Sequence, residues 1–177
     1  MAGTLWTIGH STRSLDEFIA VLQAHDIRAL ADVRRFPASR RYPHFNRTSL
    51  AERLQAAGVQ YHWLPELGGR RNPRADSRNT AWRNRSFRGY ADYMETAAFQ
   101  DAMATLQSLA VASATAIMCA EALWWRCHRA LIADYLAAHG ARVIHIVDVH
   151  HSESHRYTDA ARVVDGALSY ADPQGMT

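Results

Sequence analysis

The stretch Thr115–Gly140, TAIMCAEALWWRCHRALIADYLAAHG, decides the fold class of this chain. It opens with a short apolar run, Thr115–Met118, which is typical of a buried strand. Apolar residues then recur with the spacing of one helix face, and these are Leu131, Ile132, Tyr135 and Leu136. Gly140 follows where a helix C-terminal cap belongs. The stretch therefore predicts a strand over about 115–120 that leads through a loop into a helix over about 127–139.

The loop between this strand and this helix gathers reactive side chains. They are two thiols, a carboxylate, an imidazole and a guanidinium, namely Cys119, Glu121, Cys127, His128 and Arg129. Open α/β sheets bind their ligands at such junctions, outside the carboxyl ends of the strands. We therefore expect a ligand site here.

Strands and helices alternate along the rest of the chain. Apolar runs predict strands at Leu5–Ile8, Ile27–Val33, Val59–Leu64 and Arg142–Val149. Helices are predicted from Ser14 to Ala24, from Ser49 to Ala57, and over Phe87–Met94, Ala97–Leu109 and Thr158–Leu168. Capping boxes, Ser14 with Glu17 and Ser49 with Glu52, open the first two. The predicted fold class is α/β: a single three-layer domain over residues 1–177, with about five mostly parallel strands and helices on both faces.

The connections between these elements are uneven. Residues 34–48 and 65–83 form irregular loops rich in arginine. The second loop is long and polar, and we expect it to be partly mobile. The tail after about residue 168 is expected to be frayed.

The basic residues are also unevenly distributed. All twenty are arginine, and thirteen of them lie within residues 34–88, beside only three acidic residues. That segment carries a formal charge of +10 and the rest of the chain −7, which sum to the +3 of the whole. A GC-rich coding bias explains the absence of lysine but not the clustering. The asymmetry indicates an anionic partner, either a small molecule or a nucleic acid.

Composition excludes several classes of protein. Hydrophobic residues make up 48% of the chain and charged residues 21%, as in ordinary globular domains. No apolar run approaches the roughly 20 residues of a membrane span, and the N-terminus lacks a secretory signal pattern. Two closely spaced cysteines do not make a disulfide framework. We therefore expect a cytoplasmic protein with no membrane partner, whose oligomeric state the sequence leaves open.

Several motifs occur together in one order. They are Thr7–Thr12 (TIGHST), Asp32–Arg40 (DVRRFPASR), Phe45–Asn46, Leu64–Arg70 (LPELGGR), Tyr90 with Tyr93, Met118–Glu121 (MCAE) and Cys127–Arg129 (CHR). Through these motifs the chain resembles the DUF488 family, whose name records that its function was unknown when the family was defined. The resemblance implies a compact α/β domain with the motifs gathered at one site. It implies no particular reaction.

One loop departs from the family pattern. Where the family usually carries polar residues, this chain has Ala122–Arg126, ALWWR. Two exposed tryptophans would be unusual on the surface of a soluble protein. We therefore expect Trp124 and Trp125 to pack over the site or onto a partner.

Cys127 is the first candidate for catalysis. It is predicted at a helix N-terminus beside His128 and Arg129, and both the helix dipole and nearby cations favour a thiolate. Cys119 is expected at a buried strand end, in contact with the substrate. Two alternatives stay open: both thiols serve as small apolar fillers, or they form a reversible Cys119–Cys127 disulfide.

Four further residues complete the candidate catalytic set, and these are Glu121, His128, His10 and Asp32. His10, Asp32 and Glu121 all come at predicted strand ends, so we expect them at one rim of the sheet. The carboxylates serve either in acid–base catalysis or in holding neighbouring arginines in place. The imidazoles serve in proton transfer or as ordinary polar rim residues.

Candidate substrate-binding residues come from the same motifs. Guanidinium groups offer forked donors that match phosphate or carboxylate oxygens. The full set is Ser11, Arg34, Arg35, Arg40, Arg70, Tyr90, Cys119 and Arg129. Aromatic residues interleave with the arginines at Tyr42, Phe45, Trp82 and Phe87, a composition that also suits stacking on nucleic-acid bases.

A metal site is a further alternative. Cys119, Glu121, Cys127 and His128 could supply thiolate, carboxylate and imidazole ligands to zinc or iron. Adjacent ligands on a helix diverge by about 100°, however, and no paired CxxC is present. We therefore assign no residue as a metal ligand.

Three functional hypotheses follow. The first is an enzyme, a hydrolase or transferase, that acts on a phosphate-bearing or nucleotide-like anionic substrate at the Cys/His/Glu/Arg site. The second is a nucleic-acid-binding module that uses residues 34–88. The third is a metal or thiol redox sensor. The number of ionisable side chains at the predicted strand ends favours the first.

Overall fold

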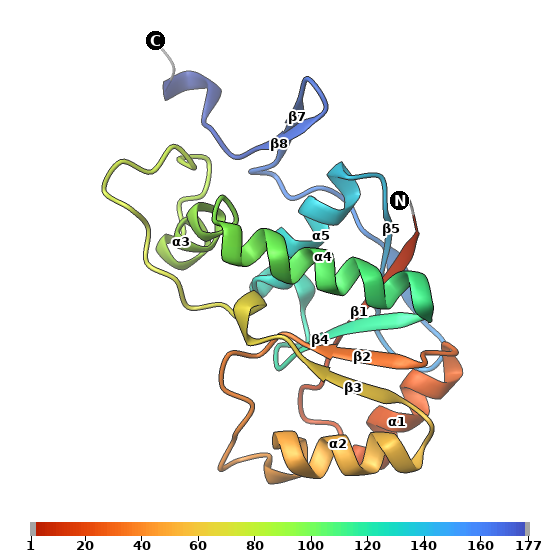
Figure 1. Cartoon of the computed structure of the whole chain (residues 1–177). Helices are drawn as coiled ribbons and strands as arrows, with labels where there is room; N and C mark the ends of the chain where they lie inside the picture. Colours follow the sequence, from red (N-terminus) through yellow and green to blue (C-terminus); the bar gives the residue numbers. More distant parts are fainter. Residues whose placement is uncertain (1–2, 176–177) are drawn as a thin grey trace.

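A six-stranded sheet forms the centre of the computed structural model, which describes residues 3–175 (Figure 1). Its strands are β1 (Thr4–Gly9), β2 (Ala29–Asp32), β3 (Gln60–Trp63), β4 (Thr115–Cys119), β5 (Arg142–Ile146) and β6 (Ser152–Ser154). They lie in the order β3-β2-β4-β1-β5-β6. The first five are parallel, and β6 pairs antiparallel with β5. The predicted α/β class with a mostly parallel sheet is confirmed, with one short edge strand more than predicted.

Helices cover both faces of this sheet (Figure 1). The helices α1 (Leu15–Ala24) and α2 (Arg47–Ala56) share one apolar core with the sheet. The helices α3 (Arg85–Tyr93), α4 (Ala97–Ala112) and α5 (Arg129–Ala138) share the other. Among the described residues no helix has the length and apolar character needed to span a membrane.

The strand β4 is buried along its whole length because it lies between two strands and two helical layers. Alternate side chains of a strand point to opposite faces. Ile117 accordingly enters the core beneath α4 and α5, while Met118 enters the core beneath α1 and α2. The continuous apolar run that begins at Thr115 is the sequence signature of this central position.

The strands are not added to the sheet in sequence order, and the order changes at β4. From β1 it passes to β2 and β3, and it then returns to place β4 between β1 and β2. The strand ends that follow Gly9, Asp32 and Cys119 therefore lie at one edge. Gly9 lies so close to the chain after β4 that an added Cβ would stand 1.8 Å from the Glu121 carbonyl oxygen. Only glycine fits where the two segments meet.

Two predicted capping boxes had different outcomes. Ser14 caps α1, because its Oγ accepts a hydrogen bond from the Glu17 amide at 3.1 Å. The box predicted at Ser49 is wrong, since α2 begins two residues earlier with Asn46 at its N-cap position. Asn46 is held there by its side-chain oxygen, which accepts a hydrogen bond from the Ser39 amide at 2.7 Å.

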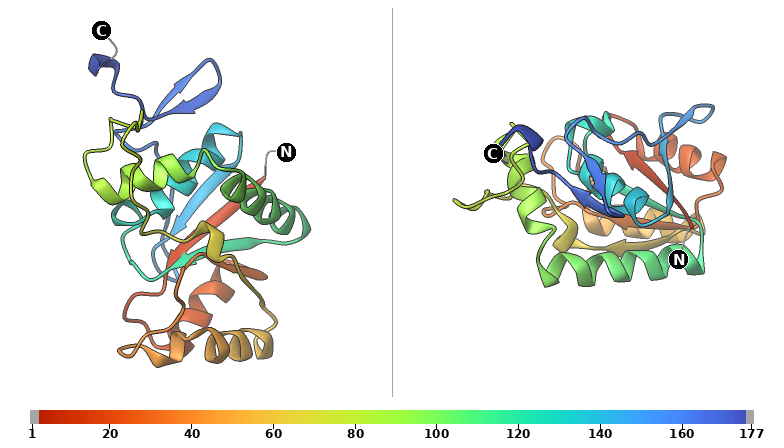
Figure 2. Two further views of the ribbon diagram at one scale, coloured as in Figure 1. Left: turned by 60° about the vertical axis from the view of Figure 1, so that its left-hand side comes forward. Right: turned by 90° about the horizontal axis from the view of Figure 1, so that it is seen from above.

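The predicted helix over Thr158–Leu168 is also wrong. A hairpin forms instead, from β7 (Arg162–Val164) and β8 (Ala167–Ser169), and it lies beyond α5 in Figures 1 and 2. Asp165 and Gly166 connect the strands with φ values of 52° and 79°, as a tight Asp-Gly hairpin turn requires.

The tail expected to fray after about residue 168 is anchored at its start. That boundary falls inside β8, and the residue that follows this strand, Tyr170, is buried. Its hydroxyl donates a hydrogen bond to Asp134 at 2.8 Å. Residues 176 and 177 of the expected tail lie outside the described residues.

Candidate functional site

A cavity of about 450 Å³ opens at the edge of the sheet where β2 and β4 end. Four arginines line it, and these are Arg34, Arg35, Arg70 and Arg126. Glu121 is the only acidic residue of the lining, so the formal charge of the walls is strongly positive. Cys119, Cys127, His128 and Tyr90 also line it. The predicted strand-to-helix junction therefore does hold a cavity.

The two thiols of the cavity lie in contact. Cys119 is the last residue of β4, and Cys127 follows the short helical turn η3 (Trp124–Arg126) just before α5. Their sulfur atoms are 3.1 Å apart, and both cysteines are free. The first backbone amide of α5, that of Arg129, points at the Cys127 sulfur from 3.4 Å. Cys127 thus occupies the helix N-terminus that the sequence predicts.

A buried guanidinium lies behind the thiols. Arg129 is 1% exposed, and its Nε lies 3.5 Å from the Cys127 sulfur. Its remaining donors reach neutral oxygens: the Thr7 hydroxyl, and the carbonyls of Glu121 and Ala122. No carboxylate of residues 3–175 forms an ion pair with Arg129. A buried cation without a carboxylate favours an anion on the neighbouring sulfur.

The pKa values of the two thiols are driven apart by this arrangement. Burial by itself would raise the pKa of Cys127, but the hydrogen bond with Cys119 and the charge of Arg129 outweigh burial and lower this pKa to about 5. Burial and the adjacent Cys127 hold the pKa of Cys119 well above its usual value. At neutral pH the pair therefore consists of a Cys127 thiolate and a Cys119 thiol.

His128 is a neutral imidazole in a fixed orientation. Its Nε2 lies 3.1 Å from the carbonyl oxygen of Val33, and because a carbonyl only accepts, Nε2 carries the proton. Burial lowers the pKa of His128, which keeps the ring uncharged. Gly69 lies against the unprotonated face, where an added Cβ would stand 3.0 Å from Nδ1. His128 can therefore accept a proton at Nδ1, but its one N–H proton is already donated to the Val33 carbonyl.

Tyr90 lines the cavity from α3, but its hydroxyl proton is already engaged in a hydrogen bond. Its hydroxyl donates to the Leu67 carbonyl at 2.8 Å, and its ring lies 5.3 Å from that of His128. Burial raises the pKa of Tyr90 well above its usual value. The residue is a neutral wall of the cavity.

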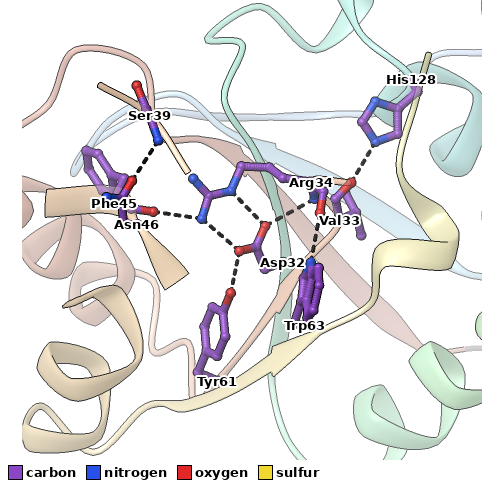
Figure 3. A network of polar contacts seen from close by, with 9 residues as sticks. All are labelled: Asp32, Val33, Arg34, Ser39, Phe45, Asn46, Tyr61, Trp63 and His128. Atoms are coloured by element: carbon purple, nitrogen blue, oxygen red, sulfur yellow. Dashed lines mark hydrogen bonds and ion pairs between the residues drawn. The ribbon is translucent and has the colours of Figure 1, made fainter. Parts of the chain in front are cut away.

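Asp32 and Arg34 form a closed network beside the cavity (Figure 3). Arg34 grips both carboxylate oxygens of Asp32 through Nε at 2.9 Å and Nη2 at 2.8 Å. The Tyr61 hydroxyl and the Arg34 amide also donate to Asp32, which is fully buried and does not line the cavity. Of the two roles that the sequence left open for Asp32, this geometry favours orienting an arginine. Arg34 Nη1 makes no hydrogen bond with the described residues, so it is available to a ligand (Figure 3).

Comparison with known proteins identifies the family. The model of a domain of unknown function, DUF488, matches residues 14–136. The chain belongs to the DUF488 family. Searches of curated proteins and of solved structures found no match. Every residue that lines the cavity falls within the matched range. The strands β1 and β5 lie outside that range.

Five of the residues predicted for the DUF488 site do not line the cavity, and these are His10, Ser11, Asp32, Arg40 and Arg129. His10 lies on the opposite side of the sheet edge, stacked on the Phe45 ring at 4.2 Å in the core of α1 and α2. Burial lowers its pKa to about 4, so it is neutral. Arg40 is exposed on the loop after β2.

Arg126 lines the cavity although sequence reasoning did not select it. It belongs to the ALWWR loop, whose most distinctive residues in the sequence are the two tryptophans. Trp124 is buried and stacks on His145 at 4.4 Å, whereas Trp125 is 51% exposed. The neighbouring CHR motif was the available signal, because Arg126 directly precedes Cys127.

The four residues considered as zinc or iron ligands are not arranged as a metal site. Among residues 3–175 no group of three or more His, Cys, Asp or Glu side chains is placed to hold an ion. The two thiols are in contact, but His128 turns its Nε2 to Val33 and Glu121 is exposed. The four side chains are close in sequence, but they belong to a strand end, a loop and a helix start. They therefore do not all point toward one metal position.

The Asp32 network predicts a measurable loss of stability. Replacing Asp32 by Asn leaves a buried guanidinium without its anion and should lower the free energy of unfolding by about 3–5 kcal/mol. Asp16→Asn is the control, because Asp16 pairs with Arg53 at the exposed surface and should cost at most about 1 kcal/mol. Urea denaturation measures both. Equal losses would show that burial does not strengthen the Asp32 pair.

The thiolate predicts reactivity at low pH. Alkylation of the native protein by iodoacetamide should follow a titration with its midpoint at about pH 5, since Cys127 is a thiol below that pH and a nucleophilic thiolate above it. Rates measured by mass spectrometry from pH 4 to 9 test this. Cys127→Ser is the control and should remove the reaction at neutral pH, because Cys119 stays protonated. A midpoint near 8.5, that of an ordinary cysteine, would contradict the arrangement.

Proposed function

We propose that this DUF488 protein is an enzyme whose Cys127 thiolate attacks an electrophilic atom of a phosphate-bearing substrate. The contact between the Cys127 sulfur, which lines a cavity rich in arginine, and the buried Arg129 behind it carries the proposal. The sulfur electron pair forms the new covalent bond, and the leaving group departs with the pair of the bond that breaks. Transfer of the bound group to water makes the enzyme a hydrolase, and transfer to another acceptor makes it a transferase.

Proton transfer falls to the groups around the sulfur. Glu121 reaches the cavity with an exposed carboxylate and can exchange protons with solvent, as a general acid or base must. Neutral His128 can accept a proton at Nδ1 during the second half of the reaction. Cys119 donates its proton toward the Cys127 sulfur and so steadies the thiolate before attack.

The arginines of the cavity suit a phosphate group. Arg34 is held rigidly by Asp32 and keeps Nη1 free, while Arg35, Arg70 and Arg126 have exposed side chains that can close on an anion. Guanidinium groups bind phosphate oxygens through paired, charge-assisted hydrogen bonds. One rigid and three adaptable cations support recognition of a multiply charged anion.

A second cavity, of about 860 Å³, supports a nucleotide-like substrate. It shares the ring of Phe87 with the first cavity. Its other walls include the rings of Trp82, Trp125 and Tyr157, and the last two are 51% and 44% exposed. Exposed aromatic rings beside an anion site are suited to stacking on a planar base.

The partners of the clustered arginines weigh against the nucleic-acid alternative. Three of the thirteen within residues 34–88 line the cavity. Others are engaged within the chain: Arg53 and Arg74 in ion pairs, and Arg47 and Arg71 over the rings of Trp63 and Tyr93. These arginines serve separate local roles, which favours a small anionic substrate.

Calorimetric titration tests the substrate class. Adenosine 5′-monophosphate should bind, and adenosine should not, because the arginines require the phosphate. Arg126→Gln should weaken binding about tenfold, the effect of losing one charge-assisted contact of about 1.5 kcal/mol. Trp125→Ala should weaken binding of the nucleotide but not of ribose 5-phosphate.

Arg40→Gln is the matched control for this titration, because Arg40 is exposed and does not line the cavity. It should bind like the native protein. Failure of every phosphate-bearing compound to bind, or an equal loss in Arg40→Gln, would overturn the proposed substrate class.

The contact between the two sulfurs supports a second candidate function, a thiol redox sensor. At 3.1 Å the pair needs to close by about 1 Å to reach the length of a disulfide bond. With a disulfide as oxidant, the Cys127 thiolate attacks one of its sulfurs and expels a thiolate. Cys119 then loses its proton, attacks the Cys127 sulfur and expels the second thiolate. Two electrons pass from the cysteine pair to the oxidant.

Oxidised glutathione tests this candidate. The native protein should lose the mass of two hydrogen atoms, whereas Cys119→Ser should stop at a mixed disulfide on Cys127. Intact-protein mass spectrometry distinguishes the two products. A stable mixed disulfide in the native protein would argue against the sensor and leave the nucleophile proposal unaffected.

A further inference from the structure

A buried chain of hydrogen bonds continues inward from Arg129. Arg129 Nη1 donates to the Thr7 hydroxyl at 3.1 Å, and Thr7 Oγ1 lies 2.6 Å from His145 Nδ1. His145 Nε2 lies 2.8 Å from His155 Nδ1, and His155 Nε2 lies 2.8 Å from Asp134 Oδ1. The chain links β1, β5, α5 and the segment after β6, and no described residue of it faces the cavity.

With both imidazoles neutral, the two ends of this hydrogen-bonded chain determine the direction of every proton in it. A guanidinium can only donate, so the Thr7 oxygen accepts from Arg129 and its hydroxyl proton is free for His145 Nδ1. A carboxylate can only accept, so His155 carries its proton on Nε2, toward Asp134. His145 then donates from Nε2 to His155 Nδ1, and each contact has one donor and one acceptor.

Burial keeps the chain in this single state. The side chains of His155 and Asp134 are 2% and 0% exposed, and Thr7 and His145 are also buried. Burial, followed by the proximity of His155, lowers the pKa of His145 to about 3, so this ring is neutral. The indole of Trp124 covers the His145 ring in parallel at 4.4 Å and separates it from solvent.

Asp134 is fixed independently of the histidines. Its carboxylate also accepts hydrogen bonds from the Thr158 amide and hydroxyl and from the Tyr170 hydroxyl. It is therefore a rigid anchor at the far end of the chain. A rigid acceptor at one end and a guanidinium at the other leave the Thr7 oxygen a single orientation.

We propose that Thr7, His145, His155 and Asp134 are positioning residues that hold the Arg129 guanidinium against the Cys127 sulfur. This rests on the proposed function, in which that sulfur is the nucleophile. The chain conducts no proton to the sulfur, because an arginine does not deprotonate in proteins. It acts by geometry: without the Thr7 acceptor, the guanidinium is free to rotate away from Cys127.

The charged and titratable groups that face Cys127 come from several elements. They are Cys119 on β4, Tyr90 on α3, and His128 and Arg129 at the start of α5. Of these, only Arg129 contacts the buried chain. A change at Thr7 therefore reaches the Cys127 thiolate most directly through Arg129, which contacts both the Thr7 hydroxyl and the Cys127 sulfur.

The pH dependence of iodoacetamide alkylation tests the proposal. Thr7→Val replaces the hydroxyl by a methyl group of similar size and should raise the midpoint of Cys127 alkylation by about one pH unit, a tenfold lower thiolate fraction below the midpoint. Thr7→Ser keeps the hydroxyl and should restore the native midpoint. His155→Gln, which removes the link to Asp134, should raise it in the same direction. Circular dichroism confirms that each variant is folded.

His151→Gln is the matched control, because the His151 side chain pairs with Asp148 at the exposed surface and should leave the midpoint unchanged. Folded Thr7→Val and His155→Gln proteins with native midpoints would overturn the positioning role. A native midpoint near 8.5 would instead overturn the proposed thiolate function itself. The two failures are therefore distinguishable in one experiment.

Discussion

The charge of the Arg129 guanidinium is the constraint on which the candidate site depends. A buried cation is costly unless anions or oriented dipoles compensate it. Arg129 is surrounded by carbonyl oxygens, a hydroxyl and a sulfur, and by no carboxylate of the described residues. The two thiols are the neighbouring groups that can become an anion, and it is the Cys127 sulfur that lies within hydrogen-bond distance of the Arg129 amide and Nε. The same interaction therefore stabilises the cation and activates the nucleophile.

This guanidinium also fixes the backbone around it. The carbonyl of Glu121 turns inward to accept from Arg129 at 2.7 Å, which brings the loop after β4 directly over the end of β1. Gly9 permits that approach, because the same carbonyl oxygen would lie 1.8 Å from any added Cβ. A glycine in one motif and an arginine in another are thus two requirements of a single loop conformation.

The arginines in and behind the cavity divide into a rigid pair and an adaptable set of three. Arg34 and Arg129 are buried and held by several hydrogen bonds each, so their positions do not depend on a ligand. Arg35, Arg70 and Arg126 are exposed and have few fixed contacts. Preorganised charges lower the cost of binding, whereas flexible ones allow closure after binding. The division suits a site that orients one end of a substrate before enclosing it.

Local pattern in the sequence was sufficient for the elements and for the thiols. The apolar run from Thr115 and the periodicity from Leu131 predicted the strand and helix, because propensity and spacing act within a few residues. They also placed Cys127 at a helix N-terminus. The helix predicted over Thr158–Leu168 failed against a local signal of equal strength, the Asp165-Gly166 turn.

Only the tertiary structure decided which side chains meet. Asp32 and His10 follow strand ends as predicted, yet one is held by Arg34 and the other packs on Phe45, outside the cavity. Thr7 and His145, 138 residues apart, lie in hydrogen-bond contact because β1 pairs with β5. The sequence determined where strands end and which residues stand there. Strand order and side-chain direction, set by burial on both faces of the sheet, determined which of those residues form the site.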